Sequence, residues 1–203
     1  QRCLAKTPDD RFPDFQVMRE LLRERYMQET GSPAPQPAKG DKLDSRDLNN
    51  KGVNLQTLGC PPEELLSYYE RALEMDPSNA TAWSNRGNTL SHLARLQDAL
   101  ASYEHALEMD PDYYRAWFNK GLQYSKLGRD LEALDCFDRA IEIRIHDEGM
   151  WFMKGNTLYK LGRIQDALIC YERALEVNPQ LGPGWAGKGL VLADLEQPDD
   201  ALI

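Results

Sequence analysis

The sequence contains few of the residues that hold metal ions or disulfide frameworks. It has four cysteines and three histidines among 203 residues. No two cysteines have the C-x-x-C spacing, and His92, His105 and His146 share no ligand spacing, whereas such spacings are typical of zinc and redox sites. We therefore expect no metal site, no cofactor and no disulfide. Unpaired cysteines are typical of a reducing cytosol.

The sequence also lacks a long apolar run and a surplus of positive charge. Its apolar runs are far shorter than the roughly 20 residues of a membrane-spanning helix, and no signal peptide is visible. Lys and Arg number 24 against 33 Asp and Glu, which gives a net charge of −9. This balance argues against nucleic acid or an anionic membrane as the main partner. We expect a cytoplasmic location and no membrane span within these residues.

What the sequence has instead is a strict period. Trp83, Trp117, Trp151 and Trp185 are 34 residues apart. A glycine follows each tryptophan by four residues, an alanine follows by sixteen and, after the first three, an aromatic residue follows by twenty. A fixed period of this length is typical of a solenoid, in which each unit buries its apolar face against its neighbours.

Each period is predicted to form two helices. Between Trp117 and Leu127 the apolar residues fall at helical spacing, and Gly128 then interrupts the pattern before a second amphipathic segment. Gly121 and Ala133 are small at the places where the two helices are expected to cross most closely. A larger side chain at either place would push the helices apart.

These recurring Trp, Gly, Ala and aromatic residues resemble the tetratricopeptide repeat family, whose units are helix–turn–helix hairpins of 34 residues. The resemblance covers roughly residues 45–203. It implies an all-α fold, a right-handed superhelical solenoid of such repeats. The expected units are 45–79, 80–113, 114–147, 148–181 and an incomplete 182–203.

The chain departs from the family pattern in two places. A proline follows the second helix at Pro77, Pro111 and Pro179, whereas Ile145 takes this place in the unit 114–147. Because isoleucine does not stop a helix as proline does, we expect the second helix of that unit to run on. The last unit stops at residues 201–203, in the middle of an apolar face. We therefore expect a fragment that self-associates through this end or frays there.

The N-terminal segment gives a second signal. Residues 1–27 are predicted to form an isolated amphipathic helix, and the string CLAKTPDDRF within them resembles the last segment of a eukaryotic-like Ser/Thr protein kinase domain. The resemblance rests on Cys3, Leu4, Pro8 and Arg11. The alternative is an unrelated docking helix. Residues 28–44 are rich in proline and glycine and are expected to form a flexible linker.

The chain lacks the motifs that phosphoryl transfer needs. A Gly-rich loop, the strand lysine, the H-R-D loop and the D-F-G motif are absent from the sequence. Without them nothing would hold the nucleotide, the metal ion or the attacking hydroxyl. We expect that the chain as given is not an enzyme and that any kinase activity belongs to a parent protein.

The family resemblance also implies a concave groove that binds peptides and is lined by the first helix of each unit. Its lining places are the second, fifth, sixth, ninth, twelfth and thirteenth. The candidate binding residues at these places are Asn50, Asn85, Asn88, Arg115, Phe118, Asn119, Lys126, Phe152, Met153, Asn156, Tyr159 and Lys160. No catalytic residue is expected among them.

The chemistry of these candidates suits an extended peptide. An asparagine side chain offers both a donor and an acceptor, so a row of them can bond a peptide backbone of any sequence. The apolar and basic candidates favour a ligand with apolar anchors and some acidic residues. The alternative is structural: the asparagines bond only neighbouring helices, and the aromatic rings bury themselves between repeats.

The expected function is therefore a protein-interaction module, the C-terminal recruitment or regulatory region of a Ser/Thr protein kinase in signal transduction. The alternative is a free-standing adaptor or assembly scaffold with no kinase attached. One narrower binding mode is disfavoured. Some family members clamp a C-terminal carboxylate with five residues, and only Asn88 and Asn119 match that set.

Overall fold

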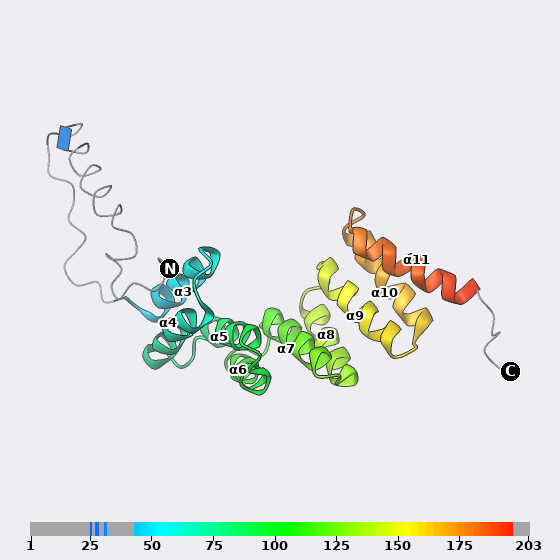
Figure 1. Cartoon of the computed structure of the whole chain (residues 1–203), viewed down its shortest axis with the longest axis horizontal. Helices are drawn as coiled ribbons and strands as arrows, with labels where there is room; N and C mark the ends of the chain where they lie inside the picture. The colour runs from blue at the N-terminus through cyan, green and yellow to red at the C-terminus, as the bar shows by residue number, and fades with distance from the viewer. Residues whose placement is uncertain (1–24, 26, 29–30, 32–42, 197–203) are drawn as a thin grey trace.

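The computed structural model describes residues 25, 27–28, 31 and 43–196, and helices are the regular structure of this part of the chain. They are α3 (Ser45–Thr57), α4 (Pro62–Met75), α5 (Ala80–His92), α6 (Leu96–Met109), α7 (Tyr114–Lys126), α8 (Asp130–Ile143), α9 (Glu148–Lys160), α10 (Ile164–Val177) and α11 (Gly182–Glu196). They follow one another along an elongated array (Figure 1). The expected all-α solenoid is confirmed. The predicted N-terminal helix and linker lie almost entirely outside the described residues.

Contacts between the helices define two faces of the array. Each odd-numbered helix from α3 to α9 packs against the helix that follows it, and the odd-numbered helices also contact one another in succession. No contact joins successive even-numbered helices in residues 43–196. The odd-numbered helices are therefore crowded on the inner side of the array, while the even-numbered helices fan out on the outer side.

Within each helix pair, an aromatic ring of the second helix lies on a glycine of the first. The pairs are Gly52–Tyr69, Gly87–Tyr103, Gly121–Phe137 and Gly155–Tyr171. A Cβ atom added to any of these glycines would lie 2.6–2.9 Å from the nearest ring atom, closer than carbon atoms can approach without displacement. The four rings are at most 2% exposed. The sequence prediction of a close crossing at Gly121 and Ala133 agrees with this packing, since the Cβ would also lie 3.2 Å from the Ala133 carbonyl oxygen.

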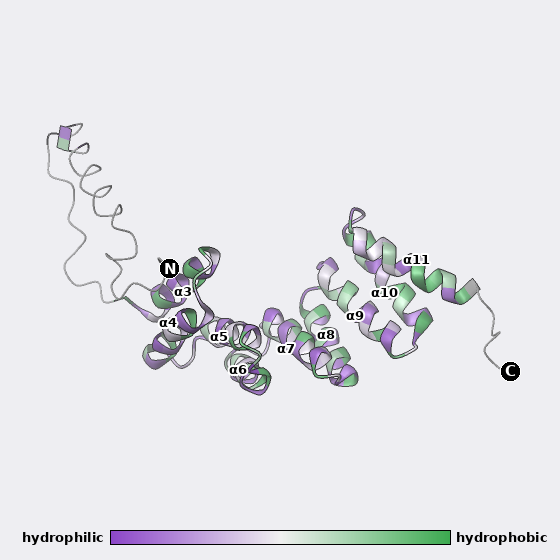
Figure 2. Cartoon of the chain, viewed as in Figure 1, coloured by the Kyte–Doolittle hydropathy of each residue, from purple (hydrophilic) through white to green (hydrophobic). Residues whose placement is uncertain are grey.

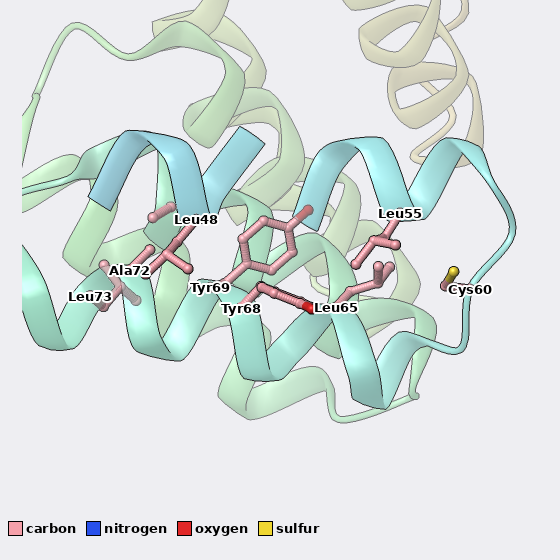
Figure 3. Packing of buried hydrophobic residues seen from close by; sticks show 9 residues of the cluster. Leu48, Leu55, Cys60, Leu65, Tyr68, Tyr69, Ala72 and Leu73 are labelled. Carbon is pink, nitrogen blue, oxygen red and sulfur yellow. The ribbon is translucent and has the colours of Figure 1, made fainter. Parts of the chain in front are cut away.

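The first helix pair shows how the apolar residues close around such a ring. Leu48 and Leu55 of α3 point toward Leu65, Tyr69 and other apolar residues of α4, as Figure 3 shows. Leu48, which takes the place of the recurring tryptophan, is 1% exposed. Burial of this kind contributes about 25 cal/mol for each Å² of apolar surface removed from water.

Each of the four tryptophans forms a hydrogen bond to the turn that precedes its helix. In each case the indole Nε1 donates a hydrogen bond to a backbone carbonyl oxygen six residues earlier, over 2.8–2.9 Å. The acceptors are the carbonyl oxygens of Pro77, Pro111, Ile145 and Pro179. Each tryptophan therefore fixes the angle at which one helix pair follows the previous one.

The prediction that the second helix of the unit 114–147 runs on is wrong. Helix α8 has 14 residues and ends at Ile143, and Arg144 already has a non-helical backbone, with φ −139° and ψ 89°. Helices α6 and α10 have the same length. The turn forms without proline because Trp151 bonds the carbonyl oxygen of Ile145, which any residue offers at this place.

Charge pairs repeat at the same period and join one helix pair to the next. Arg86, Lys120, Lys154 and Lys188 lie on α5, α7, α9 and α11, and they pair with Glu70, Glu104, Asp138 and Glu172 of the preceding even-numbered helices. Each cation also lies 5.7–5.9 Å from the centroid of the tryptophan ring of its own helix. Part of the acidic surplus of the chain is neutralised in this way.

The last described helix exposes apolar side chains. Trp185 is 54% and Leu190 50% exposed on α11, and much of α11 is coloured as hydrophobic in Figure 2. The predicted self-association concerns residues 201–203, which lie outside the described part of the chain. Among the described helices, none combines the length and the apolar character that crossing a membrane requires.

We predict that Gly121→Ala lowers the free energy of unfolding by about 1–3 kcal/mol, because the new methyl group meets the Phe137 ring. Gly189→Ala is the matched control, since Gly189 has the same place in α11 but no described atom lies within 4 Å of the position that its new methyl group would take. That variant should be neutral or stabilising by up to about 1 kcal/mol. Urea unfolding followed by circular dichroism measures both, and equal effects would contradict this packing of ring on glycine.

Candidate functional site

Two cavities lie between α5 and α7 on the inner side of the array. The first, here called the Arg115 cavity, has a volume of about 310 Å³ and is lined by Ser84, Asn85, Asn88, Tyr113, Tyr114, Arg115, Phe118, Asn119, Asp147 and Met150. The second, the Gln123 cavity, also has about 310 Å³ and is lined by Gln56, Asn88, Ser91, His92, Tyr103, Asn119, Leu122, Gln123 and Lys126. Asn88 and Asn119 line both, so the two cavities adjoin along these amides.

Half of the candidate binding residues meet at these two cavities. They are Asn85, Asn88, Arg115, Phe118, Asn119 and Lys126. The other half, namely Asn50, Phe152, Met153, Asn156, Tyr159 and Lys160, line neither cavity. The first group lies on α5 and α7, and the second lies on α3 and α9.

The asparagines differ in how far the fold already uses their side chains. Asn85 Nδ2 donates to the Oδ1 atom of the buried Asn49 over 2.9 Å. Asn88 Oδ1 and Asn156 Oδ1 each accept the hydroxyl of the tyrosine that packs beside them, over 2.8 Å. Asn119 makes no side-chain hydrogen bond within residues 43–196. The alternative that the asparagines bond only neighbouring helices therefore accounts for some of their amide atoms. Other amide atoms have no partner among the described residues and are available to a ligand.

The aromatic candidates are half-buried against the second helix of their own pair. The Phe118 ring centroid lies 5.8 Å from that of Phe137, and Phe152 lies 5.9 Å from Tyr171. Phe118 nevertheless lines the Arg115 cavity. Tyr159 is engaged at its hydroxyl, which donates to Asp194 over 2.7 Å. Phe118 is thus the aromatic candidate that both packs and faces a cavity.

The basic candidates have different partners. Lys160 forms an ion pair with Asp130 over 2.8 Å, while Lys126 donates to the neutral Ser91 hydroxyl over 2.9 Å. Arg115 donates to the Tyr114 hydroxyl over 3.0 Å, and this hydrogen bond raises the pKa of the guanidinium. Asp147 lies in the same cavity, where its side chain caps α9. Lys126 is therefore a cavity cation with no carboxylate partner among the described residues.

Sequence reasoning missed Gln123 and Ser91. Gln123 is 1% exposed, and its Oε1 atom accepts from the Ser91 hydroxyl over 2.7 Å. Gln123 occupies the tenth place of its unit, which was not among the groove places, whereas Thr89 and Thr157 occupy the tenth place of their units. The signal in the sequence is that Gln123, with a long amide side chain, stands where these two units have the short hydroxyl side chain of threonine.

A related signal explains an unpaired hydroxyl in the first helix pair. The hydroxyls of Tyr103 and Tyr171 each donate to an asparagine at the ninth place of their unit, whereas the unit of Phe137, which has no hydroxyl, has Leu122 at that place. The unit of Tyr69 has Val53 at this place, and the buried Tyr69 hydroxyl has no partner among the described residues. A buried unsatisfied hydroxyl costs about 1–3 kcal/mol.

Three buried thiols complete the titratable groups of the core. Cys60, Cys136 and Cys170 are buried, and burial raises the pKa of Cys136 and of Cys170 to about 11. These two thiols stay protonated near neutral pH and are weak nucleophiles. No group of three or more potential metal ligands gathers in the part of the chain that the structure describes.

We predict that two tyrosine-to-phenylalanine substitutions differ in their effect on the free energy of unfolding. Tyr103→Phe should lower the free energy of unfolding by about 1 kcal/mol, since Asn88 loses its partner. Tyr69→Phe should be neutral or stabilising, because the removed hydroxyl has no partner among the described residues. Urea unfolding at pH 7 measures both, and an equal loss in the two variants would contradict this difference.

The buried hydroxyl of Tyr69 also makes the stability of the fold depend on pH at high pH. Burial raises the pKa of Tyr69 from 10.0 to about 12, so the unfolded chain loses this proton first. The free energy of unfolding therefore falls as the pH rises above 10 toward 12. In Tyr69→Phe, the free energy of unfolding should fall less between pH 10 and pH 12 than in the unchanged chain. The part of the fall that comes from the other buried tyrosines should remain.

Comparison with known proteins identifies repeats in the same region. The tetratricopeptide repeat model matches residues 80–113, 114–146 and 150–181. The model of the protein prenyltransferase alpha subunit repeat matches residues 62–93, which span α4 and α5. No curated protein matches the chain significantly. The matches lie within 62–181, so the kinase resemblance of residues 1–27 rests on the sequence alone.

Several solved structures share the fold. A crystal structure of MamA is 20% identical, with a TM-score of 0.66 over 71% of this chain and 84% of that chain. MamA from Desulfovibrio magneticus is 18% identical, with a TM-score of 0.68 over 78% and 88% of the two chains. YrrB, described as a TPR protein with an unusual peptide-binding site, is 24% identical, with a TM-score of 0.65 over 88% and 86%. At these identities the likeness shows a common architecture.

Proposed function

Because the chain folds as a solenoid that contains tetratricopeptide repeats, we propose that it is a non-enzymatic module that binds an extended segment of a partner protein. The observation that carries this proposal is the pair of adjoining cavities between α5 and α7. They lie on the inner side of the array, where the odd-numbered helices meet. The YrrB structure is described as having a peptide-binding site, which supports this class of function by analogy of fold.

The amides between the cavities suit the backbone of an extended peptide. Tyr103 occupies Asn88 Oδ1, which leaves Asn88 Nδ2 as a donor, and the whole Asn119 amide is unused by the described residues. Such groups bond a peptide carbonyl or N–H whatever the peptide sequence. On binding, such a donor exchanges a hydrogen bond to water for a hydrogen bond to the ligand. Each good hydrogen bond of this kind therefore contributes about 0.5–1.5 kcal/mol to the binding free energy.

Two further residues give the proposed site some selectivity. Phe118 presents apolar surface to the Arg115 cavity and is held by packing on Phe137, so an apolar ligand side chain meets a preordered ring. Arg115 is exposed at the same cavity and favours acidic ligand residues. We propose that the site is formed by the six candidates on α5 and α7, namely Asn85, Asn88, Arg115, Phe118, Asn119 and Lys126. The other six candidates line neither cavity, are not part of this proposed site and stay predictions from the sequence: Asn50, Phe152, Met153, Asn156, Tyr159 and Lys160.

We test the site with Phe118→Ala plus Asn119→Ala, against a random peptide display library. The double variant should bind selected peptides at least about tenfold more weakly than the unchanged chain, because it loses an apolar anchor and an amide. Asn50→Ala is the matched control, since Asn50 has the sixth place of its unit, as Asn119 does, but lines neither cavity. Fluorescence anisotropy with one labelled peptide gives the affinities.

Stability separates binding from folding in this test. Asn119→Ala alone should change the free energy of unfolding by less than about 0.5 kcal/mol, since no described residue bonds its side chain. Equal peptide affinity for the double variant and the unchanged chain would contradict the proposed site. Selection of no peptide at all would contradict the proposed function.

From the resemblance of residues 1–27 we also propose that the parent protein is a cytoplasmic Ser/Thr protein kinase that recruits substrates through these repeats. A tether of residues 28–44 would raise the local concentration of a bound substrate. The alternative is a free-standing adaptor. The reading frame upstream of Gln1 should encode H-R-D and D-F-G motifs, and a frame without them would contradict the kinase proposal while leaving the peptide-binding proposal intact.

A further inference from the structure

One buried amide at the proposed site is only half satisfied. Gln123 on α7 is 1% exposed. Its Oε1 atom accepts from Ser91 over 2.7 Å, but its Nε2 atom has no hydrogen-bond partner in the described part of the chain. A buried donor without an acceptor is costly to a fold, so such a group is a candidate for bonding a ligand.

A chain of hydrogen bonds through Ser91 engages the oxygen end of the Gln123 amide. Lys126 Nζ donates to Ser91 Oγ over 2.9 Å, and an ammonium can only donate. The Ser91 hydroxyl accepts from Lys126 and donates its own hydrogen to the Oε1 atom of the Gln123 amide. The chain of donors runs from Lys126 through Ser91 to Gln123, and it leaves the N–H groups of Nε2 as the unused end.

The corresponding residues of the neighbouring repeats do not behave in this way. Thr89 and Thr157 stand 34 residues before and after Gln123. Their hydroxyls donate to carbonyl oxygens of their own helices over 2.9 Å, so both are satisfied internally. Gln123 instead lines a cavity of about 310 Å³. Gln123, the residue at this place that is not satisfied within its own helix, therefore lies beside a cavity that a ligand can enter.

The charges around this cavity favour an anion. No aspartate or glutamate lines the Gln123 cavity, whereas Lys126 does, and Lys126 has no ion-pair partner among the described residues. The equivalent lysine of the next repeat, Lys160, is neutralised by Asp130. Asp147 lies in the adjoining Arg115 cavity. The surplus of donors and the single ammonium are therefore specific to the Gln123 cavity.

We propose that the Gln123 cavity binds the side-chain carboxylate of an acidic residue in the bound peptide. Gln123 Nε2 and Lys126 Nζ would each donate to the carboxylate, and charge-assisted bonds of this kind are the stronger ones. One lysine matches the single charge of a carboxylate better than the nearly double charge of a phosphate group. This inference rests on the proposed peptide-binding function and names the chemistry of one subsite within it.

The experiment selects random twelve-residue peptides from a display library on the full chain and on three variants. Gln123→Met removes the buried amide with little change in size, and Lys126→Met removes the ammonium. Lys160→Met is the matched control, because Lys160 has the same place in the next repeat but lines neither cavity. Urea unfolding checks that each variant is folded, and the exposed Lys126 provides a test that does not disturb the core.

The unchanged chain and Lys160→Met should enrich Asp or Glu at one position at a fixed distance from an apolar residue. Gln123→Met and Lys126→Met should lose this acidic enrichment and keep the apolar one. In a selected peptide, replacing the acidic residue by its amide should weaken binding to the unchanged chain about tenfold and binding to either cavity variant less than twofold.

Each other outcome decides against the inference in a distinguishable way. Peptides without an acidic position, or an acidic position that persists in both cavity variants, would overturn the carboxylate subsite while leaving peptide binding intact. Tighter binding of a phosphoserine peptide than of the glutamate peptide would assign the subsite to phosphate instead. If no peptide is selected by any version of the chain, the proposed function fails and this inference fails with it.

Discussion

The contact between one aromatic ring and one glycine sets the geometry of every helix pair from α3 to α10. The ring of Tyr69, Tyr103, Phe137 or Tyr171 occupies the space in which a side chain of the facing glycine would lie. The two helices can therefore approach closely, and the ring is sealed from water. Because the hydroxyls of Tyr103 and Tyr171 also bond the asparagine at the ninth place of their units, this packing ties groove side chains to the core.

The groove is consequently a surface that packing and binding share. Tyr103 takes one atom of Asn88, Asn49 accepts from Asn85, and Phe137 supports Phe118. What remains for a ligand are the atoms that packing does not use. This division makes the asparagines neither purely structural nor purely free, and it places the centre of the proposed site between α5 and α7, where unused amides and cavities coincide.

Backbone atoms explain why the solenoid tolerates a change at a turn. The recurring tryptophan bonds a carbonyl oxygen, and Ile145 supplies this oxygen as well as Pro111 does. The cation beneath each tryptophan then pairs with an acidic residue of the preceding helix pair, as Lys120 does with Glu104. Successive pairs are thus joined by a hydrogen bond and an ion pair that recur at the same period as the sequence.

The period of 34 residues determined the helices, their pairing and the small residues at the crossings, because each of these depends on spacing along one helix hairpin. The resemblance to the tetratricopeptide repeat family also implied a groove that α5 and α7 help to line. The sequence could not decide that α8 stops before Ile145, since a backbone carbonyl carries no sequence signal. Nor could it show that the Gln123 amide lacks a hydrogen-bond partner at one end, because a missing partner, like the cavity beside it, exists only once α5 and α7 lie side by side. Local pattern fixed the repeat, and only the packing of one repeat on the next decided which polar atoms were left for a ligand.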